Sequence, residues 1–393
     1  MRKNIKLVSL FVYTGDDDNI RINTVYDLLA ENNDLELITT DFNHRKKEKH
    51  EINKSKRNLK LINVPEYKQN LSIKRFYSHG IFAYQLYKYL NKINKKPDVI
   101  YCIVPTISSA YACGLICKKF KIKLAVDVID LWPESLIAIL PFKKFFEIIT
   151  LPWKLFANKI YAKADYLFAE SVEYAKVAQK HNKKTKALAV YLGTDIEKYE
   201  KLITQSTIKI EKPENEIWMC YGGGMGNSYD FEVILEAIKE IHLMNKYKFK
   251  FLFIGGGLKQ AKIQEYIDKY NLPAIITGFL PYHDFLKYLS FCDIALNSFN
   301  KNTKVVHSYK FNDYLLSGLA IVNNLKGETA ELIEKYKTGI NFDYKNNLLK
   351  DKLVYLLENK SEIAEMKKNS LYIANNVFNT KIIYKEMLKQ IES

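Results

Sequence analysis

Long hydrophobic runs are missing from this chain of 393 residues, and cysteine is scarce. No apolar stretch reaches the roughly 18 residues that a membrane-spanning helix needs, which excludes a transmembrane protein. The five cysteines form no set with metal-ligand spacing, so we expect neither a disulfide scaffold nor a structural zinc site. With 48% hydrophobic and 26% charged residues, the composition also excludes a disordered chain. A globular protein of two or three domains remains.

The amino-terminal sequence imitates a signal peptide, because MRKNIK is followed by the apolar stretch LVSLFVY. The apolar part is short and no small-residue cleavage site follows it. We therefore interpret it as a first buried strand and expect a cytoplasmic protein.

Positive charge is in excess, since 60 lysines and arginines against 44 acidic residues give a formal net charge of +16. Such an excess suits nucleic acid, an anionic membrane surface or a phosphorylated ligand. The lysines are spread along the whole chain and form no concentrated stripe with interleaved stacking residues. We therefore expect no nucleic-acid partner, although a basic nucleic-acid-binding protein stays open as an alternative function.

Short apolar runs alternate with amphipathic stretches of helical length, which predicts an α/β fold with doubly wound parallel sheets. The predicted strands are 6–12, 35–40, 59–64, 99–104, 123–128, 166–169 and 187–191 in the first half, and 217–221, 249–254, 274–277, 294–297 and 320–323 in the second. A charged, core-poor stretch interrupts the alternation, so we place a linker near 195–215. The predicted division is an amino-terminal domain (1–200), a carboxy-terminal domain (213–375) and a final helix (376–393).

Three glycine-bearing turns follow predicted strands of the second half, with the sequences GGGMGNS at 222–228, GGG at 255–257 and GFLP at 278–281. Backbone N–H groups in such turns can approach an anion closely, and ligands of open parallel sheets bind beyond the carboxyl ends of the strands. For each turn alone, a tight bend that needs positive φ is the alternative. Together the turns predict a nucleotide or phosphate site.

The segment SYKFNDYLLSG predicts a helix that is capped by Ser308 and ends at Gly318. In one interpretation Lys310 holds a diphosphate and Asp313 accepts a hydrogen bond from a ribose hydroxyl. In the other, these two side chains form a solvent-facing ion pair at i, i+3 spacing.

In the first half, the sequence VIDLWPES places Asp130 just beyond the carboxyl end of strand 123–128, where catalytic groups of parallel sheets tend to lie. Asp127 falls within that strand, so its buried carboxylate needs a partner. The triplet Asp16-Asp17-Asp18 imitates a metal-binding Asp-x-Asp motif. We interpret it as a solvated turn and predict no metal site.

These motifs resemble those of GT-B glycosyltransferases of the large retaining family 4, particularly members that build bacterial surface and capsular polysaccharides. The resemblance rests on the passages VIDLWPES, VYLGTD, CYGGGMGNSYDFEVILEAI, and YKFNDYLLSGLAIV followed by LKGETAELI. It implies two Rossmann-like domains that face a cleft, with an acceptor on the first, a UDP-linked sugar donor on the second, and a final helix that crosses back to the first. It implies no cofactor besides the nucleotide-sugar substrate.

The resemblance also implies roles for individual residues. Asp130 matches the acidic residue that faces the reacting centre. The positions that match donor contacts are Gly224, Gly226, Asn227, Gly278, Phe279, Lys310 and Asp313. Candidates on the acceptor side are Asp18, Arg21, His79, Trp132 and Glu134. For His79, capping of a nearby helix is the alternative.

The chain departs from the family pattern at several positions. Val305 stands where the first glutamate of a Glu-x7-Glu pattern is expected. Gly224 and Tyr229 replace an expected basic pair, and Ile129 replaces a histidine. We therefore expect Lys310 to bear more of the diphosphate charge, helped by the nearby Lys304 or His307.

The resemblance predicts a hexosyltransferase of cell-surface polysaccharide biosynthesis that works with retention and without a metal. A nucleotide-sugar 2-epimerase of the same fold is the second alternative. The stretch 142–163 mixes apolar residues with lysines and is either a core-packed helix or an interfacial helix on anionic lipid. An interfacial helix suits a lipid-linked saccharide acceptor and a peripheral position on the inner face of the cell membrane.

Overall fold

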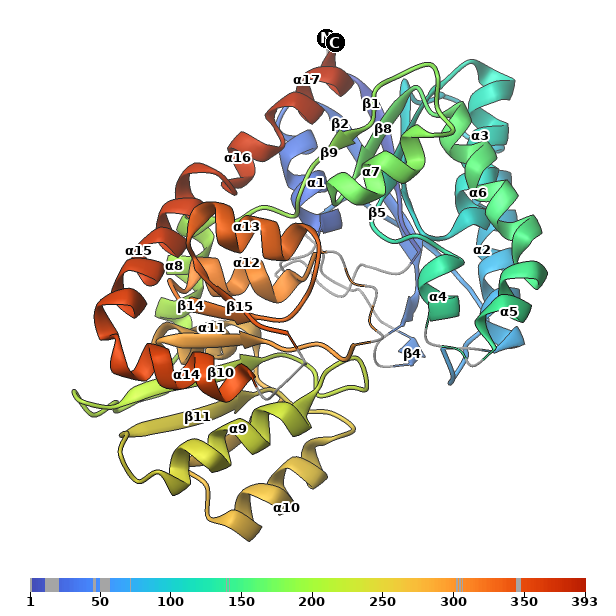
Figure 1. Cartoon of the computed structure of the whole chain (residues 1–393). Helices are drawn as coiled ribbons and strands as arrows, with labels where there is room; N and C mark the ends of the chain where they lie inside the picture. Colours follow the sequence, from blue (N-terminus) through green and yellow to red (C-terminus); the bar gives the residue numbers. More distant parts are fainter. Residues whose placement is uncertain are drawn as a thin grey trace. The chain divides into compact units, whose positions relative to one another are not determined.

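Two structural units divide the chain in the computed structural model shown in Figure 1. Unit 1 comprises Met1–Leu192 together with Tyr384–Ser393, and unit 2 comprises Gly193–Ile383. The structure describes residues 2–10, 21–44, 47–49, 57–70, 72–138, 140, 142–301, 303, 305, 307–343 and 348–393.

Unit 1 alternates strands and helices along the chain. Its strands are β1 (Asn4–Val8), β2 (Asp34–Thr40), β3 (Phe42–Asn43), β4 (Glu48–Lys49), β5 (Leu59–Ile62), β6 (Val99–Val104), β7 (Lys123–Val128), β8 (Tyr166–Ala169) and β9 (Leu188–Ala189). Its helices are α1 (Arg21–Ala30), α2 (Ile73–Lys92), α3 (Ile107–Phe120), α4 (Glu134–Ala138), α5 (Lys143–Ile149), α6 (Leu151–Lys163), α7 (Val172–Gln179) and α17 (Lys385–Glu392).

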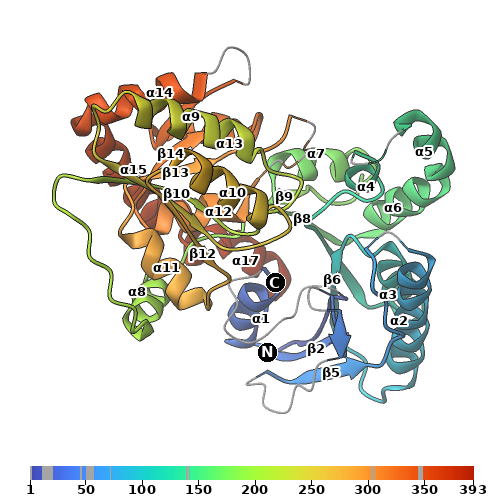
Figure 2. The same cartoon turned by 90° about the horizontal axis from the view of Figure 1, so that it is seen from below.

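The sheet of unit 1 has seven parallel strands in the order β5-β2-β1-β6-β7-β8-β9. Figure 2 shows α1 and α17 on one side of this sheet and α2, α3 and α6 on the other. Because both faces are covered, β6 and nearly all of β7 are buried along their length. The antiparallel pair β3–β4 lies outside this sheet.

Unit 2 repeats the alternation. Its strands are β10 (Ile217–Gly222), β11 (Phe249–Ile254), β12 (Ala274–Gly278), β13 (Ile294–Asn297), β14 (Ala320–Asn323) and β15 (Gly339–Asn341). Its helices are α8 (Ile196–Gln205), α9 (Phe231–Leu243), α10 (Gln260–Tyr270), α11 (Tyr282–Ser290), α12 (Tyr309–Leu316), α13 (Glu328–Tyr336), α14 (Leu348–Glu358), α15 (Lys360–Asn376) and α16 (Thr380–Ile383). The strands form one parallel sheet in the order β12-β11-β10-β13-β14-β15. The predicted α/β fold with doubly wound parallel sheets is confirmed.

A buried ion pair gives Asp127 the partner that its place in β7 requires. The Arg21 guanidinium, at the first residue of α1, donates to both carboxylate oxygens of Asp127 at 2.7 and 2.8 Å, and both side chains are fully buried. The Tyr101 hydroxyl also donates to Asp127 at 2.7 Å. Tyr384, from the carboxy-terminal segment of unit 1, lies 3.4 Å from the same guanidinium. Arg21 therefore holds the core of unit 1 together and exposes no group to an acceptor.

The stretch expected as a linker is part of unit 2 instead. Asp195 caps helix α8 by accepting a hydrogen bond from the Lys198 amide at 3.0 Å, and Tyr199 is buried. The Ser206 hydroxyl donates to Asp284 of α11 at 2.6 Å. An amphipathic face thus suffices to pack a stretch that is rich in charge.

The carboxy-terminal region also differs in detail from the prediction. Residues up to Ile383 belong to unit 2, and only the last ten residues belong to unit 1. The helix expected over 376–393 is divided into α16 and α17, and α15 ends at Asn376 before it. The Thr194 hydroxyl donates to the Ala374 carbonyl of α15 at 2.6 Å.

Candidate functional site

The three glycine-bearing turns of unit 2 lie together at the carboxyl edge of its sheet. The Gly223 amide donates to the Ile254 carbonyl at 2.8 Å, and the Met225 amide donates to the Gly256 carbonyl at 2.9 Å. Gly255 in turn pairs with Gly278 of the third turn. The turns after β10, β11 and β12 therefore form one continuous loop cluster.

Two kinds of glycine occur in this cluster. A Cβ on Gly255 would lie 2.2 Å from the Gly223 oxygen, and one on Gly257 would lie 2.8 Å from the Met225 nitrogen, so these two glycines allow the loops to approach. A Cβ on Gly224, Gly226 or Gly278 would meet no atom within 4 Å. These three positions border open space. They are the glycines that the resemblance assigns to the donor.

The Lys310 ammonium lies beneath the first glycine turn. It donates to the Tyr221 hydroxyl, which itself donates to the Gly224 carbonyl at 2.8 Å. A Cβ on Gly223 would lie 2.8 Å from Cε of Lys310. Helix α12 carries Lys310 in its first turn, so the side chain reaches the end of β10 from the neighbouring element.

Lys310 is a buried cation, with 8% of its surface exposed. Among the described residues, its ammonium forms no ion pair within 4 Å, and Asp313 is no exception. The interpretation of Lys310 and Asp313 as a solvent-facing ion pair is therefore wrong. Burial lowers the pKa of Lys310 well below its ordinary value, and the charge of Asp313 opposes this shift. A buried cation with no paired carboxylate suits an anionic ligand.

Asp313 lies one turn further along α12 and is half-buried. Its Oδ1 accepts a hydrogen bond from the Tyr282 hydroxyl at 2.7 Å. Burial raises the pKa of Asp313 to about 7, against the opposing effects of Tyr282 and Lys310. This carboxyl group therefore changes its charge near neutral pH.

Phe279 and Asn227 lie at the outer side of the loop cluster. The Phe279 ring is 79% exposed and approaches the second turn, since a Cβ on Gly256 would lie 3.0 Å from it. Asn227 is exposed. An exposed aromatic ring beside a glycine-bearing turn is suited to stack on a planar base.

Sequence reasoning missed Lys259, which follows the second glycine turn. Its amide donates to the Met225 carbonyl at 3.1 Å, and its ammonium donates to the Tyr229 carbonyl at 3.1 Å. This half-buried lysine brings a second positive charge to the loop cluster. Its position two residues after GGG was the available signal, but separations of 34 and 30 residues along the chain concealed its contacts with Met225 and Tyr229.

The residues expected to help Lys310 are placed differently. His307 is buried, stacks on Phe378 at 6.1 Å, and has its pKa lowered to about 4 by burial, so it is neutral at neutral pH. Lys304 lies outside the described residues. Val305, at the position of the missing glutamate, is half-buried.

In unit 1, the structure gathers Asp130, Trp132, His79 and Glu134. Asp130 accepts hydrogen bonds at 2.8 Å from the Leu131 amide and from Nε1 of Trp132. The Trp132 ring stacks on that of His79, with centroids 6.2 Å apart. Burial raises the pKa of Asp130, while these hydrogen bonds lower it.

The surroundings of His79, Glu134 and Asp130 determine whether each side chain is charged and what it binds. Burial lowers the pKa of His79 to about 3, so the imidazole is neutral at neutral pH. Glu134 forms an ion pair with Lys154 of α6 at 2.8 Å. The half-buried Asp130 carboxylate is therefore a hydrogen-bond acceptor at the carboxyl end of β7. Arg21 lies elsewhere, in the core, and Asp18 lies outside the described residues.

The segment 142–163 forms α5 and α6. Only Ala157, Ile160 and Tyr161 of α6 are buried, and none of α5. Large apolar side chains of this segment are exposed, namely Phe142, Phe145, Ile148, Ile149, Leu151, Leu155 and Phe156. One edge of α6 packs into unit 1, and the remaining apolar surface faces outward.

The described part of the chain has no helix with the length and hydropathy of a membrane span. It also has no group of three histidine, cysteine or acidic side chains arranged to hold a metal ion. The aspartate triplet at 16–18 lies outside this part.

Residues 203–371 match the family described as "Glycosyl transferases group 1". Unit 2 therefore carries a glycosyltransferase group 1 domain. The matched segment contains the whole loop cluster with Lys259, Lys310 and Asp313. No curated protein sequence matches the chain.

Solved structures with the same fold cover almost the entire chain. HepE from Anabaena, in complex with UDP-glucose, is 12% identical, with 100% of both chains covered and a TM-score of 0.68. Sucrose-phosphate synthase from Thermosynechococcus elongatus is 15% identical, with 100% of this chain and 98% of the other covered and a TM-score of 0.74. WaaG, a glycosyltransferase involved in lipopolysaccharide biosynthesis, is 11% identical over 97% of this chain and 98% of its own, with a TM-score of 0.65. The group 1 domain thus lies within a chain of GT-B fold with two Rossmann-like domains.

Proposed function

We propose that this chain is a glycosyltransferase that moves a hexose from a UDP-linked sugar to a lipid-linked saccharide in cell-surface polysaccharide synthesis. One observation carries the proposal: the buried Lys310 ammonium lies beneath glycines that border open space. The group 1 match supports the reaction class, and the UDP-glucose complex of HepE supports a nucleotide-sugar donor.

The loop cluster binds the donor in this proposal. Amides of Gly224, Gly226 and Asn227, together with the Lys310 ammonium, hold the diphosphate. Lys259 supplies the second positive charge that the sequence pattern lacks. Asp313 accepts a hydrogen bond from a ribose hydroxyl, and the turn Gly278–Phe279 holds the base.

Transfer breaks the bond between the anomeric carbon and the diphosphate oxygen and forms a bond to the acceptor oxygen on the same face of the sugar. Negative charge develops on the departing UDP. Lys310, Lys259 and the loop amides are already in position to stabilise it, which lowers the barrier without reorganisation and without a metal ion.

Asp130 acts on the acceptor side. Its carboxylate orients or deprotonates the acceptor hydroxyl, or stabilises the oxocarbenium-like sugar. Trp132 and Leu131 fix its position through two hydrogen bonds of 2.8 Å. The proton of the hydroxyl passes to Asp130 or to the departing phosphate.

A lipid-linked acceptor is supported by the surface of unit 1. The exposed side chains of α5 and α6 include Phe142 at 79% and Ile148 at 73% exposure, and Lys143 and Lys144 lie among them. Apolar and basic groups on one helical segment suit an interface with anionic lipid, where the acceptor of such an enzyme resides. WaaG, of the same fold, works in lipopolysaccharide biosynthesis.

The experiment is a screen of UDP-linked and other nucleotide sugars by thermal shift, followed by transfer assays with the hits and lipid-linked saccharides. A specific donor raises the melting temperature by mass action. The Asp130→Ala variant should lose transfer but keep the donor-induced shift. Unchanged transfer in this variant removes Asp130 from the mechanism, and loss of activity in EDTA contradicts a metal-free reaction.

The same assay discriminates the alternatives. A 2-epimerase changes the sugar when the donor is present without any acceptor. A nucleic-acid-binding protein retains oligonucleotides in a salt-sensitive manner and shows no shift with any nucleotide sugar. For transfer with retention, NMR of the product should give the anomeric configuration of the donor.

A further inference from the structure

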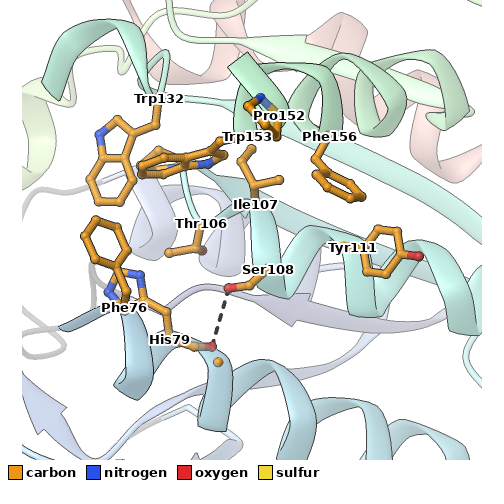
Figure 3. A pocket seen from close by; sticks show the side chains of 12 residues that line it. Phe76, His79, Thr106, Ile107, Ser108, Tyr111, Trp132, Pro152, Trp153 and Phe156 are labelled. Atoms are coloured by element: carbon orange, nitrogen blue, oxygen red, sulfur yellow. Dashed lines mark hydrogen bonds between the residues drawn. The ribbon is translucent and has the colours of Figure 1, made fainter. Parts of the chain in front are cut away.

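Unit 1 contains a pocket of about 520 Å³, shown in Figure 3. Its wall is formed by Phe76, His79 and Gly80 of α2, by the start of α3 with Tyr111, by Trp132, and by Pro152, Trp153 and Phe156 of α6. The volume falls in the range of roughly 300–1,000 Å³ that is usual for sites of small ligands. All residues of this pocket belong to unit 1, whereas the glycine-bearing loop cluster belongs to unit 2.

Four rings line one end of the pocket and contact one another. The Phe76 and Trp153 centroids are 5.5 Å apart, those of Trp153 and Trp132 are 5.9 Å apart, and both pairs meet edge to face. His79 stacks on Trp132 and meets Phe76 edge to face at 6.1 Å. In Figure 3 the two tryptophans lie opposite Phe76 and His79, with Ile107 and Phe156 further along. The wall is predominantly apolar.

Several polar groups of the wall are engaged with the protein itself. Nε1 of Trp132 donates to Asp130, the Ser108 hydroxyl donates to the His79 carbonyl at 3.4 Å, and the Thr106 hydroxyl accepts from Ser109 at 2.7 Å. A saccharide needs many hydrogen-bonding partners, whereas a hydrocarbon needs only apolar contact. The wall therefore favours a hydrocarbon over a sugar.

The surface around the pocket is apolar as well. Helices α2, α3 and α6 pack side by side. Their exposed side chains include Ile73 (88%), Tyr77 (60%), Tyr84 (59%), Tyr111 (40%), Leu115 (38%), Leu155 (51%) and Phe156 (46%). Apolar surface of this extent on adjacent helices indicates an interaction site, and the exposed Lys74, Lys143 and Lys144 suit anionic phosphate headgroups.

We propose that this pocket binds the hydrocarbon chain of the lipid-linked acceptor, which enters it from the membrane surface. The inference rests on the proposed function and deepens it. Trp132 contacts the places proposed for both parts of the acceptor, the hydrocarbon chain and the saccharide. Its ring lines the pocket, and its Nε1 donates a hydrogen bond to Asp130. A chain in the pocket therefore brings the attached head group towards Asp130, and the enzyme selects acceptors by their chain.

Gly80 offers a variant that fills the pocket. It lines the wall, lies within α2, and a Cβ there would meet no atom within 4 Å. Gly80→Leu should project a side chain into the cavity without a clash. Gly80→Ala is the matched control, because it brings the same gain in helix propensity but leaves the cavity open.

The test measures binding of dodecyl phosphate, below its micelle-forming concentration, by the fluorescence of Trp132 and Trp153 in the full chain. We expect saturable binding by the wild type and by Gly80→Ala, and an affinity about tenfold lower or worse in Gly80→Leu. Butyl phosphate should bind far more weakly than dodecyl phosphate. Equal affinity of all three proteins for dodecyl phosphate, or equal binding of the two phosphates, overturns the proposal.

A second variant and a second ligand complete the test. Phe156→Ala removes a half-exposed ring of the wall at little risk to folding and should also weaken dodecyl phosphate binding. Maltose that competes for the pocket overturns the proposal in favour of a sugar site. UDP-glucose is titrated against the same proteins: if it binds none of them, the proposed function fails, whereas intact UDP-glucose binding with no effect of Gly80→Leu on dodecyl phosphate refutes the chain pocket alone.

Discussion

The Lys310 ammonium lies 3.5 Å from the centre of the Tyr229 ring, and a second ring, that of Tyr221, lies 3.7 Å away. Aromatic faces attract a cation, but they do not neutralise it. The charge of Lys310 is therefore held in place beside the glycine turn without a paired carboxylate among the described residues. In the proposed function, this relationship gives unit 2 a prepared position for the diphosphate of a donor.

Replacing Lys310 should weaken binding of UDP-glucose without lowering the stability of the protein. Lys310→Met removes a charge-assisted hydrogen bond to the diphosphate, worth about 1.5–3 kcal/mol, so the affinity for UDP-glucose should fall roughly 10–100-fold. The melting temperature should stay the same or rise, because a buried unpaired charge is replaced by an apolar chain of similar length. Calorimetric titration and thermal unfolding check both effects. Unchanged affinity for UDP-glucose contradicts the assignment.

Donor binding should depend on pH through two groups. The pKa of Asp313 is about 7, so its carboxylate is lost as an acceptor for the ribose as the pH falls below that value. The pKa of Lys310 is lowered by burial, so its charge is lost at a lower pH than that of an exposed lysine. Tyr221 and Tyr229 face Lys310, and burial raises the pKa of both hydroxyls. Tyr199 and Tyr314 interact with Asp313, and burial raises their pKa values as well.

The affinity for UDP-glucose should therefore rise from pH 6 to about pH 7 and fall again at alkaline pH. Asp313→Asn should abolish the acidic limb, and Lys310→Met the alkaline one. Calorimetry in buffers of different ionisation enthalpy should detect proton uptake when UDP-glucose binds at alkaline pH. A flat profile from pH 6 to 8 is not compatible with the role of Asp313.

The two kinds of glycine should respond differently to alanine. Gly224→Ala and Gly226→Ala place a methyl group in open space, so stability should be kept while the ligand is kept away from the amides, with a loss of affinity of about tenfold or more. At Gly255 the backbone φ is +138°, and an added methyl group would meet the Gly223 oxygen. Gly255→Ala should therefore lower the melting temperature by several degrees. Thermal unfolding with and without UDP-glucose distinguishes these effects. The assignment fails if Gly224→Ala binds the donor normally.

The positive charge of Lys259 should strengthen binding of the donor. Lys259→Met is expected to weaken binding of UDP-glucose by about tenfold, with a smaller effect on the melting temperature of the protein without UDP-glucose. Lys262 is exposed in α10, the helix that follows Lys259, so Lys262→Met is the control and should change neither. Equal effects of the two substitutions point to general electrostatic attraction rather than to a specific contact.

The sheets of both units were predictable because buried parallel strands are short apolar runs. The strands 99–104, 123–128, 249–254, 294–297 and 320–323 have the predicted bounds. Strand β15 (Gly339–Asn341) and the pair β3–β4 were missed, since two or three residues carry no periodicity. Helix α8 was missed because its charged residues concealed one apolar face.

The glycine turns and the start of α12 were predictable, because they depend on local sequence. Contacts between segments that are distant along the chain were not predictable. Arg21 was assigned to the acceptor because nothing in its neighbourhood reveals Asp127, 106 residues away. The contacts of Lys259 with the first glycine turn were hidden for the same reason.

A crystal structure of the full chain with UDP-glucose shows whether the glycine turns bind the donor. We expect the diphosphate against the amides of Gly224 and Gly226, with a phosphate oxygen within hydrogen-bonding distance of the Lys310 ammonium. A diphosphate bound elsewhere, with Lys310 still buried against Tyr221 and Tyr229 and no ligand at the glycine turns, would contradict this expectation.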